Sequence, residues 1–159
     1  MSRAFTREED SENALADVGE RTVSTHRNLV TRRGLELIDA EVANWRAELA
    51  RAEHDQDRQK IALAARDVRY WTARRESAEL SEPEPDSKVV RFGMSVSIED
   101  EDGKKAHWRI VGEDEADPAD GSISHVSPMA IALFGKSVGD LATVNGKEWE
   151  IVGMEVGKG

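Results

Sequence analysis

Between Thr31 and Leu80 the apolar positions recur in steps of three and four, which is the spacing of a coiled-coil seam. Thr31 suits the N-cap of a first helix, and helix-forming residues dominate on both sides of the polar stretch Glu53–Asp57. Two helical runs joined by a short polar turn predict an antiparallel coiled-coil hairpin over residues 30–80. The seam positions are Leu35, Ile38, Val42, Trp45, Leu49 and Ala52, then Ile61, Ala64, Val68 and Trp71, weakening at Arg75 and Ala78.

Two apolar residues of the second run, Leu63 and Tyr70, lie off this seam. They are candidates for contact with another element or a partner. The alternative to a hairpin is one unbroken helix that dimerises, although such a helix would have to cross five polar residues without a seam contact.

A different period begins after the linker at residues 81–87, where two prolines prevent the helix from continuing. Residues 88–159 alternate with period two and contain an Asn145-Gly146 pair, which favours a tight hairpin turn. Pro128 to Phe134 is predicted to form one short helix. The pattern therefore predicts an α+β fold, with a helical hairpin followed by a small antiparallel β-sheet that packs on this helix. The predicted strand positions are Val90, Phe92, Met94, Val96 and Ile98, then Ala106, Trp108 and Ile110, and finally Leu141–Val144 and Trp149–Val152.

The segment before the hairpin, residues 1–29, is polar and carries 6 acidic and 4 basic side chains. Because it offers little apolar area to offset the entropy of ordering, we predict a disordered acidic tail. Within it, Asp10 directly precedes the run Ser11-Glu12-Asn13-Ala14, which contains Glu12.

Composition narrows the possible functions. The chain has no cysteine and four scattered histidines, so we expect no intrinsic metal site and no cofactor. No apolar run approaches the ~20 residues of a membrane span, and we expect a cytoplasmic protein without membrane contact. Residues 81–159 carry 16 acidic and 8 basic side chains, which disfavours direct binding to duplex DNA.

The run from Ser122 to Asp140, which contains Ser127-Pro128-Met129-Ala130 and Leu133-Phe134-Gly135-Lys136, resembles the C-terminal domain of the Gre transcript-cleavage factors, GreA and GreB. The preceding Arg109–Asp117 segment and the Val30–Leu35 segment resemble that family too. The resemblance implies an FKBP-like domain over residues 88–159 that docks on RNA polymerase at the rim of its secondary channel. It also implies a hairpin that enters the channel and carries acidic residues at its tip.

In that family the tip carboxylates help to hold a second Mg²⁺, which belongs to the polymerase active site, so the factor is not itself an enzyme. Polymerase-docking candidates by this resemblance are Asp114, Asp117, Ser127, Pro128 and Met129. Ile131 departs from the family, which usually has arginine there. The hairpin is also shorter than the family's full-length one, and in this respect it resembles Rnk.

The acidic residues of the turn, Glu53, Asp55 and Asp57, are the candidate tip. Asp10 and Glu12 are weaker candidates, because the family's Ser-Glu-Asn-Ala tip motif follows a helical arm whereas here it precedes one. We expect a monomeric regulator of transcription elongation that binds bacterial RNA polymerase at the secondary channel, with stimulated cleavage of backtracked RNA as its candidate action. The alternatives are a regulator that occupies the channel without cleavage, and an FKBP-like or coiled-coil interaction module unrelated to transcription.

Overall fold

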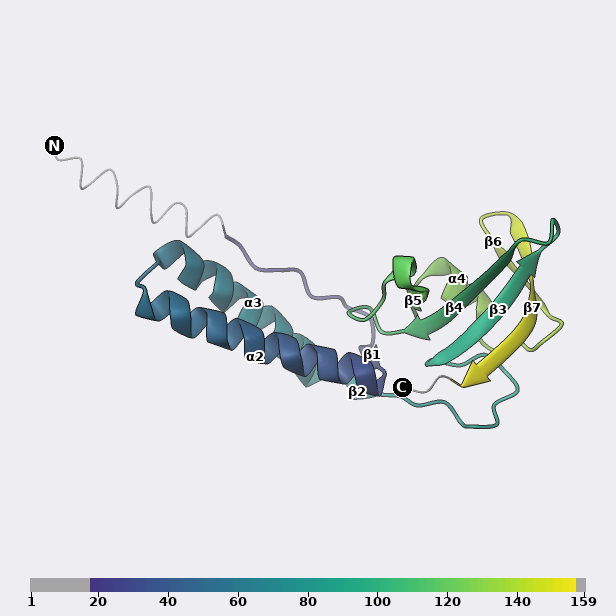
Figure 1. The fold of residues 1–159 in the computed structure, drawn as a ribbon, viewed down its shortest axis with the longest axis horizontal. Helices are drawn as coiled ribbons and strands as arrows, with labels where there is room; N and C mark the ends of the chain where they lie inside the picture. Colours follow the sequence, from purple (N-terminus) through teal and green to yellow (C-terminus); the bar gives the residue numbers. More distant parts are fainter. Residues whose placement is uncertain (1–17, 157–159) are drawn as a thin grey trace. The chain divides into compact units, whose positions relative to one another are not determined.

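The computed structural model describes residues 18–156, which divide into two compact units (Figure 1). One unit contains residues 38–77 together with the segment that ends at Thr25, and the other contains residues 26–37 and the chain from Ala78 onward. None of the helices in this range has the length and apolar character needed to cross a membrane. The elements in chain order are β1 (Leu29–Val30), α2 (Arg32–His54), α3 (Arg58–Ser77), β2 (Glu79–Leu80), β3 (Met94–Asp100), β4 (Lys105–Val111), the 3₁₀ helix η1 (Pro118–Asp120), β5 (Ser122–Ser124), α4 (Pro128–Leu133), β6 (Leu141–Val144) and β7 (Lys147–Val156).

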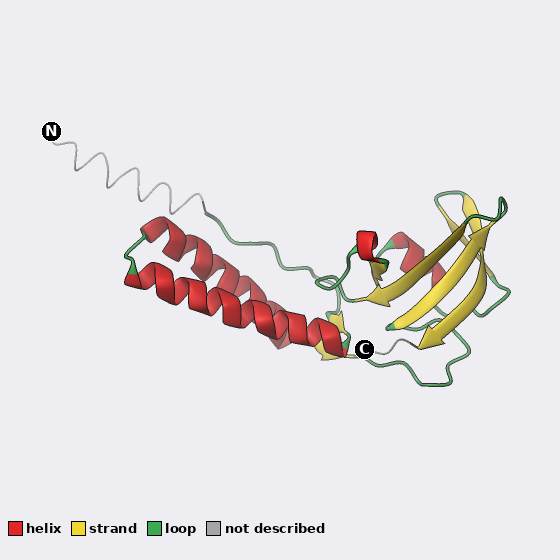
Figure 2. Cartoon of the chain, in the orientation of Figure 1, coloured by secondary structure: helices red, strands yellow, loops and turns green. Residues whose placement is uncertain are grey.

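Helices α2 and α3 form the predicted hairpin, and the chain reverses direction between His54 and Arg58 (Figure 2). The alternative of one unbroken helix is therefore wrong. The seam prediction is confirmed for most positions, since Ile38, Val42, Ala52 and Ala64 are buried and the other apolar seam residues are half-buried.

One end of the seam differs from the prediction. Arg75 is exposed and forms an ion pair with Asp39 at 2.6 Å, which links α3 to α2. Its neighbour Arg74 is the buried residue, with 1% exposure. The last buried seam residue in this part of α3 is therefore Arg74, one position before the predicted Arg75. The apolar pattern in the sequence is already weak at this point.

The segment from Val18 to Thr25 runs along α3 and is tied to it by charged contacts (Figure 1). Arg21 forms an ion pair with Asp67 at 2.8 Å, and its guanidinium lies 3.7 Å from the centre of the Tyr70 ring. Tyr70 thus contacts another element, as its position off the seam suggested. The prediction of disorder for residues 1–17 lies outside the described residues, whereas residues 18–25 have these defined contacts.

The second unit is built on a five-stranded sheet with the order β5-β4-β3-β7-β6. The two predicted hairpins, β3–β4 and β6–β7, are antiparallel as expected, and the α+β class is confirmed. Strand β5, which the sequence did not predict, pairs parallel to β4 at one edge, so the sheet is mixed rather than purely antiparallel. Val90 and Phe92 are buried but precede β3, which begins later than predicted.

A single apolar core joins the sheet to α4. The predicted turn at Asn145-Gly146 is confirmed, because φ is 51° at Asn145 and 77° at Gly146, as a type I′ turn requires. The core residues are Val90, Phe92, Val96, Ile98, Ile110, Ile123, Ala130, Leu133, Ala142, Trp149 and Ile151.

Candidate functional site

The turn at the tip of the hairpin has the geometry of a Schellman C-cap. The amide of Asp57 donates to the carbonyl of Ala52 at 3.1 Å, and the amide of Gln56 donates to the carbonyl of Glu53 at 3.2 Å. Gln56 has a φ of 54°, in the left-handed region that glycine usually occupies at this position. The turn is therefore hydrogen-bonded, yet it carries backbone strain at Gln56.

The three predicted tip carboxylates have different environments. Asp57 is the N-cap of α3, because its Oδ1 accepts a hydrogen bond from the amide of Lys60 at 3.1 Å. Glu53 and Asp55 are exposed. Within residues 18–156, no three histidine, aspartate or glutamate side chains are arranged to hold a metal ion. The capping role of Asp57 was not predicted, although an aspartate immediately before a helical run is the usual signal for it.

The other acidic candidates, Asp10 and Glu12, lie outside the described residues. The described chain begins at Val18, whose carbonyl oxygen accepts a hydrogen bond from Nη1 of Arg66 at 3.5 Å. Arg66 lies in the half of α3 that is nearer the tip.

Three of the predicted docking residues begin helix α4. Ser127 is its N-cap, since its Oγ accepts a hydrogen bond from the amide of Ala130 at 3.3 Å, and Pro128 follows in the first turn. Met129 is partly buried against the core. Pro128 is therefore the exposed member of the three, while Ser127 and Met129 stabilise the helix that presents it.

The remaining two docking candidates, Asp114 and Asp117, lie together in the segment between β4 and η1. Both line a depression of about 500 Å³, which also contains Arg33 and Arg109. Asp117 is exposed, and its backbone forms two hydrogen bonds with Ser122. The amide of Asp117 donates to Oγ of Ser122 at 2.9 Å, and the amide of Ser122 donates to the carbonyl oxygen of Asp117 at 3.1 Å. The structure thus brings Asp114 and Asp117 into one surface of mixed charge.

This segment is fixed by close contacts with the start of α2. Thr31 caps α2 as predicted, since its Oγ1 accepts from the amide of Gly34 at 3.0 Å, and it also donates to Glu115. A Cβ on Gly34 would lie 2.8 Å from Oε1 of Glu115, and one on Gly112 would lie 2.4 Å from the carbonyl oxygen of Leu29. Gly112 is therefore required by close packing against backbone, whereas a side chain at Gly34 would displace the carboxylate of Glu115. Neither contact was predicted, because the contacting residues are far apart along the chain.

Ile131, the departure from the family pattern, lies on the outer face of α4 with 63% exposure. Val138 and Leu141 of the same unit are also strongly exposed, at 58% and 54%. Most of the Ile131 side chain is therefore on the surface rather than in the core.

A charged cluster stabilises the turn between β3 and β4. Oδ1 of Asp100 accepts hydrogen bonds from the amides of Asp102 and Lys104, at 3.0 and 2.8 Å, while Oδ2 pairs with Nζ of Lys147 at 2.8 Å. The hydrogen bond from Lys147, aided by the backbone donors, lowers the pKa of Asp100 below its usual value, against the opposing effect of burial. These contacts make Asp100 a structural residue.

Comparison with known proteins identifies part of the chain. Residues 84–156 match the model of the GreA/GreB transcription elongation factor C-terminal domain. GreB of Pasteurella multocida (strain Pm70) is 42% identical over 91 residues, a match that covers 56% of this chain and 57% of that protein. GreA of Alkalilimnicola ehrlichii is 51% identical over 70 residues, covering 41% and 44% respectively. These matches span about half the length of each relative.

Among solved structures, Gfh1 of Thermus aquaticus aligns with 82% of this chain and 99% of its own, with 24% identity and a TM-score of 0.41. The family model matches residues 84–156, which belong to the second unit and include all five docking candidates. Residues 84–156 are therefore similar to the C-terminal domain of GreA and GreB, which confirms the resemblance of this part of the chain to the Gre family.

Proposed function

We propose that this protein regulates transcription elongation by binding bacterial RNA polymerase. The observation that carries the proposal is the match of residues 84–156 to the C-terminal domain of factors named for elongation, at 42% identity with one GreB and 51% with one GreA. The protein would act as an accessory factor through the polymerase, without catalysis of its own.

Docking is assigned to the second unit. Asp114 and Asp117 share one depression with Arg33 and Arg109, so this surface can form ion pairs of both signs with a partner. Pro128 and Ile131 add an exposed apolar contribution from α4. The rim of the secondary channel is the proposed contact, with Ile131 replacing a polar family contact by an apolar one.

The hairpin is proposed to enter the secondary channel. Asp57 already caps α3, so one of the three acidic side chains of the tip is used within the fold. This observation favours occupation of the channel without cleavage. Stimulated cleavage of backtracked RNA is the second candidate function, and it would depend on Glu53 and Asp55, which are exposed, or on Asp10 and Glu12.

A binding measurement tests the proposal as a whole. The full chain, immobilised, should retain core RNA polymerase, and Asp117→Lys should weaken that binding by about tenfold, the equivalent of ~1.4 kcal/mol. Glu148→Lys is the matched control, since Glu148 is exposed in the same unit and lies outside the docking depression. Absence of binding by the unmodified chain would favour the unrelated interaction module instead.

A second assay separates the two modes of action. Backtracked polymerase complexes are incubated with the chain, and the RNA is examined for shortened transcripts. Binding without shortening supports the channel occupant. Shortening that is lost in a Glu53→Ala, Asp55→Ala double variant assigns cleavage to the tip, whereas shortening lost only with Asp10→Ala and Glu12→Ala assigns it to the N-terminal segment.

A further inference from the structure

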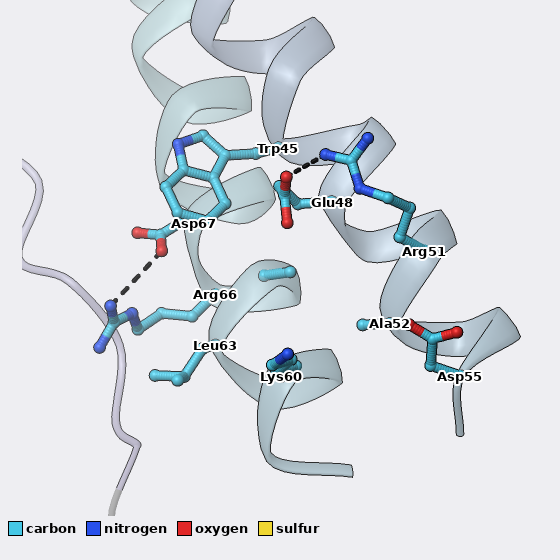
Figure 3. Close-up of a pocket in the computed structure, with 10 residues that line it drawn as sticks. Trp45, Glu48, Arg51, Ala52, Asp55, Lys60, Leu63, Arg66 and Asp67 are labelled. Carbon is cyan, nitrogen blue, oxygen red and sulfur yellow. Dashed lines mark hydrogen bonds and ion pairs between the residues drawn. The ribbon is translucent and has the colours of Figure 1, made fainter. Parts of the chain in front are cut away.

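A groove between the two helices lies next to the tip of the hairpin (Figure 3). It has a volume of about 440 Å³, and its lining comes from both helices and from the turn at Asp55. Trp45, Leu63 and Ala64 supply apolar surface, and the first two remain half-exposed in spite of their size. Leu63 is the off-seam residue for which no contacting element had been found.

The groove also carries charged groups of both signs. Its basic residues are Arg51, Lys60 and Arg66, and its acidic residues are Glu48, Asp55 and Asp67. Arg51 is paired with Glu48, but Lys60 forms no ion pair with any residue between 18 and 156. Nε of Arg66 is buried and has no hydrogen-bond acceptor among these residues. An occupant with an acidic group beside Lys60 and an apolar group over Trp45 and Leu63 fits this lining.

The described N-terminal segment leads directly to this groove. Val18 is bonded to Arg66, which lines it, and Glu20 is paired with Arg69 one turn further along α3. The segment therefore runs in the same direction as α3, although Arg21 reaches back to Asp67, and Val18 is its described residue nearest the tip. Arg66 and Arg58 are separated by about 12 Å of helix, which about four extended residues can cover.

The chemistry of the preceding residues matches the groove. Ala14-Leu15-Ala16 is an aliphatic run of a length suited to its floor. Residues 1–17 contain 5 acidic and 2 basic side chains, with Asp10 and Glu12 shortly before that run and Asp17 directly after it. We propose that residues 10–17 of this chain dock in the groove, with Leu15 against Leu63 and the acidic residues beside Lys60. This proposal does not depend on RNA polymerase.

Disulfide trapping tests the proposal, because the chain has no cysteine of its own. Leu15→Cys is combined with Leu63→Cys in the full chain, and oxidation is followed by the gel mobility of the monomer. The control combines Leu15→Cys with Gln59→Cys, which is exposed on the same helix and outside the groove. Docking predicts an intramolecular bond that forms at least about tenfold faster in the first pair, since docking raises the effective concentration of the two thiols.

Two results would overturn the proposal. Equal rates for the two pairs would show that the segment does not prefer the groove, and its occupant would then be a different protein. A bond formed only between molecules, at a rate that rises with protein concentration, would assign the groove to a second copy. If circular dichroism shows that Leu63→Cys loses helix, Glu48→Cys, an exposed groove residue on α2, replaces it in the same comparison.

Discussion

The contact of Arg21 with α3 allows a quantitative prediction. Its ion pair with Asp67 is 2.8 Å long, with side-chain exposures of 37% and 7%, and the guanidinium lies 3.7 Å from the Tyr70 ring centre. A hydrogen bond to a charged group contributes about 1.5–3 kcal/mol, and an exposed cation–π contact about 0.5–1 kcal/mol. Because Arg21 is partly exposed and Arg66 remains 3.4 Å from Asp67, we expect Arg21→Ala to cost about 2 kcal/mol of docking free energy.

Limited proteolysis measures this cost. Cleavage after Glu20 by a glutamate-specific protease requires release of the segment, and at low protease the rate follows the released population. A loss of 2 kcal/mol corresponds to about 30-fold faster cleavage, identified by the mass of the product. The control is Arg27→Ala, which removes an exposed pair with Glu79 and should change the rate much less. Equal effects of Arg21→Ala and Arg27→Ala would refute the reasoning.

Three further changes test other parts of the structure. Gln56→Gly should raise the free energy of unfolding by about 0.5–1 kcal/mol, because glycine adopts a positive φ without strain. Ala47→Gly, in the exposed middle of α2, should instead lower it by about 1 kcal/mol, and urea denaturation measures both changes. Gly112→Ala should destabilise by more than about 3 kcal/mol in thermal unfolding, since its Cβ would lie 2.4 Å from a carbonyl oxygen. Asp100→Asn should lower the free energy of unfolding at pH 7. Because the pKa of Asp100 is lowered in the folded state, the difference in this free energy between the variant and the unmodified protein should shrink as pH falls below about 4. A difference that stays constant with pH would contradict the role of Lys147.

Local patterns predicted the hairpin and the sheet because their signals are contained in short stretches of sequence. The steps of three and four placed Ile38 and Val42 in the helical seam, and Asn145-Gly146 marked a turn whose geometry requires positive φ at both residues. The pairing of β1 with β2 carried no such signal. Each strand has two residues, and Leu29 and Glu79 become partners only through the intervening hairpin.

The candidate site was less predictable, because its contacts are distant along the chain. Resemblance placed Asp114 and Asp117 together, but the bond between Thr31 and Glu115 spans 84 residues. Asp57 was assigned to the tip by charge alone, whereas its carboxylate is already used to cap α3. Charge along a sequence therefore indicated where acidic groups occur, but it did not show which of them were committed to the fold.

The two ion pairs that hold the N-terminal segment on α3 should respond differently to salt. Arg69 and Glu20 are both more than half exposed, at 55% and 64%, so salt should screen that pair strongly. Asp67 is only 7% exposed, and its pair with Arg21 is correspondingly less screened. Asp67 lines the tip groove, whereas Arg69 lies further along α3. The contact beside the groove is therefore the less screened one, so raised ionic strength should loosen the pair of Glu20 with Arg69 first and leave the segment held at Arg21.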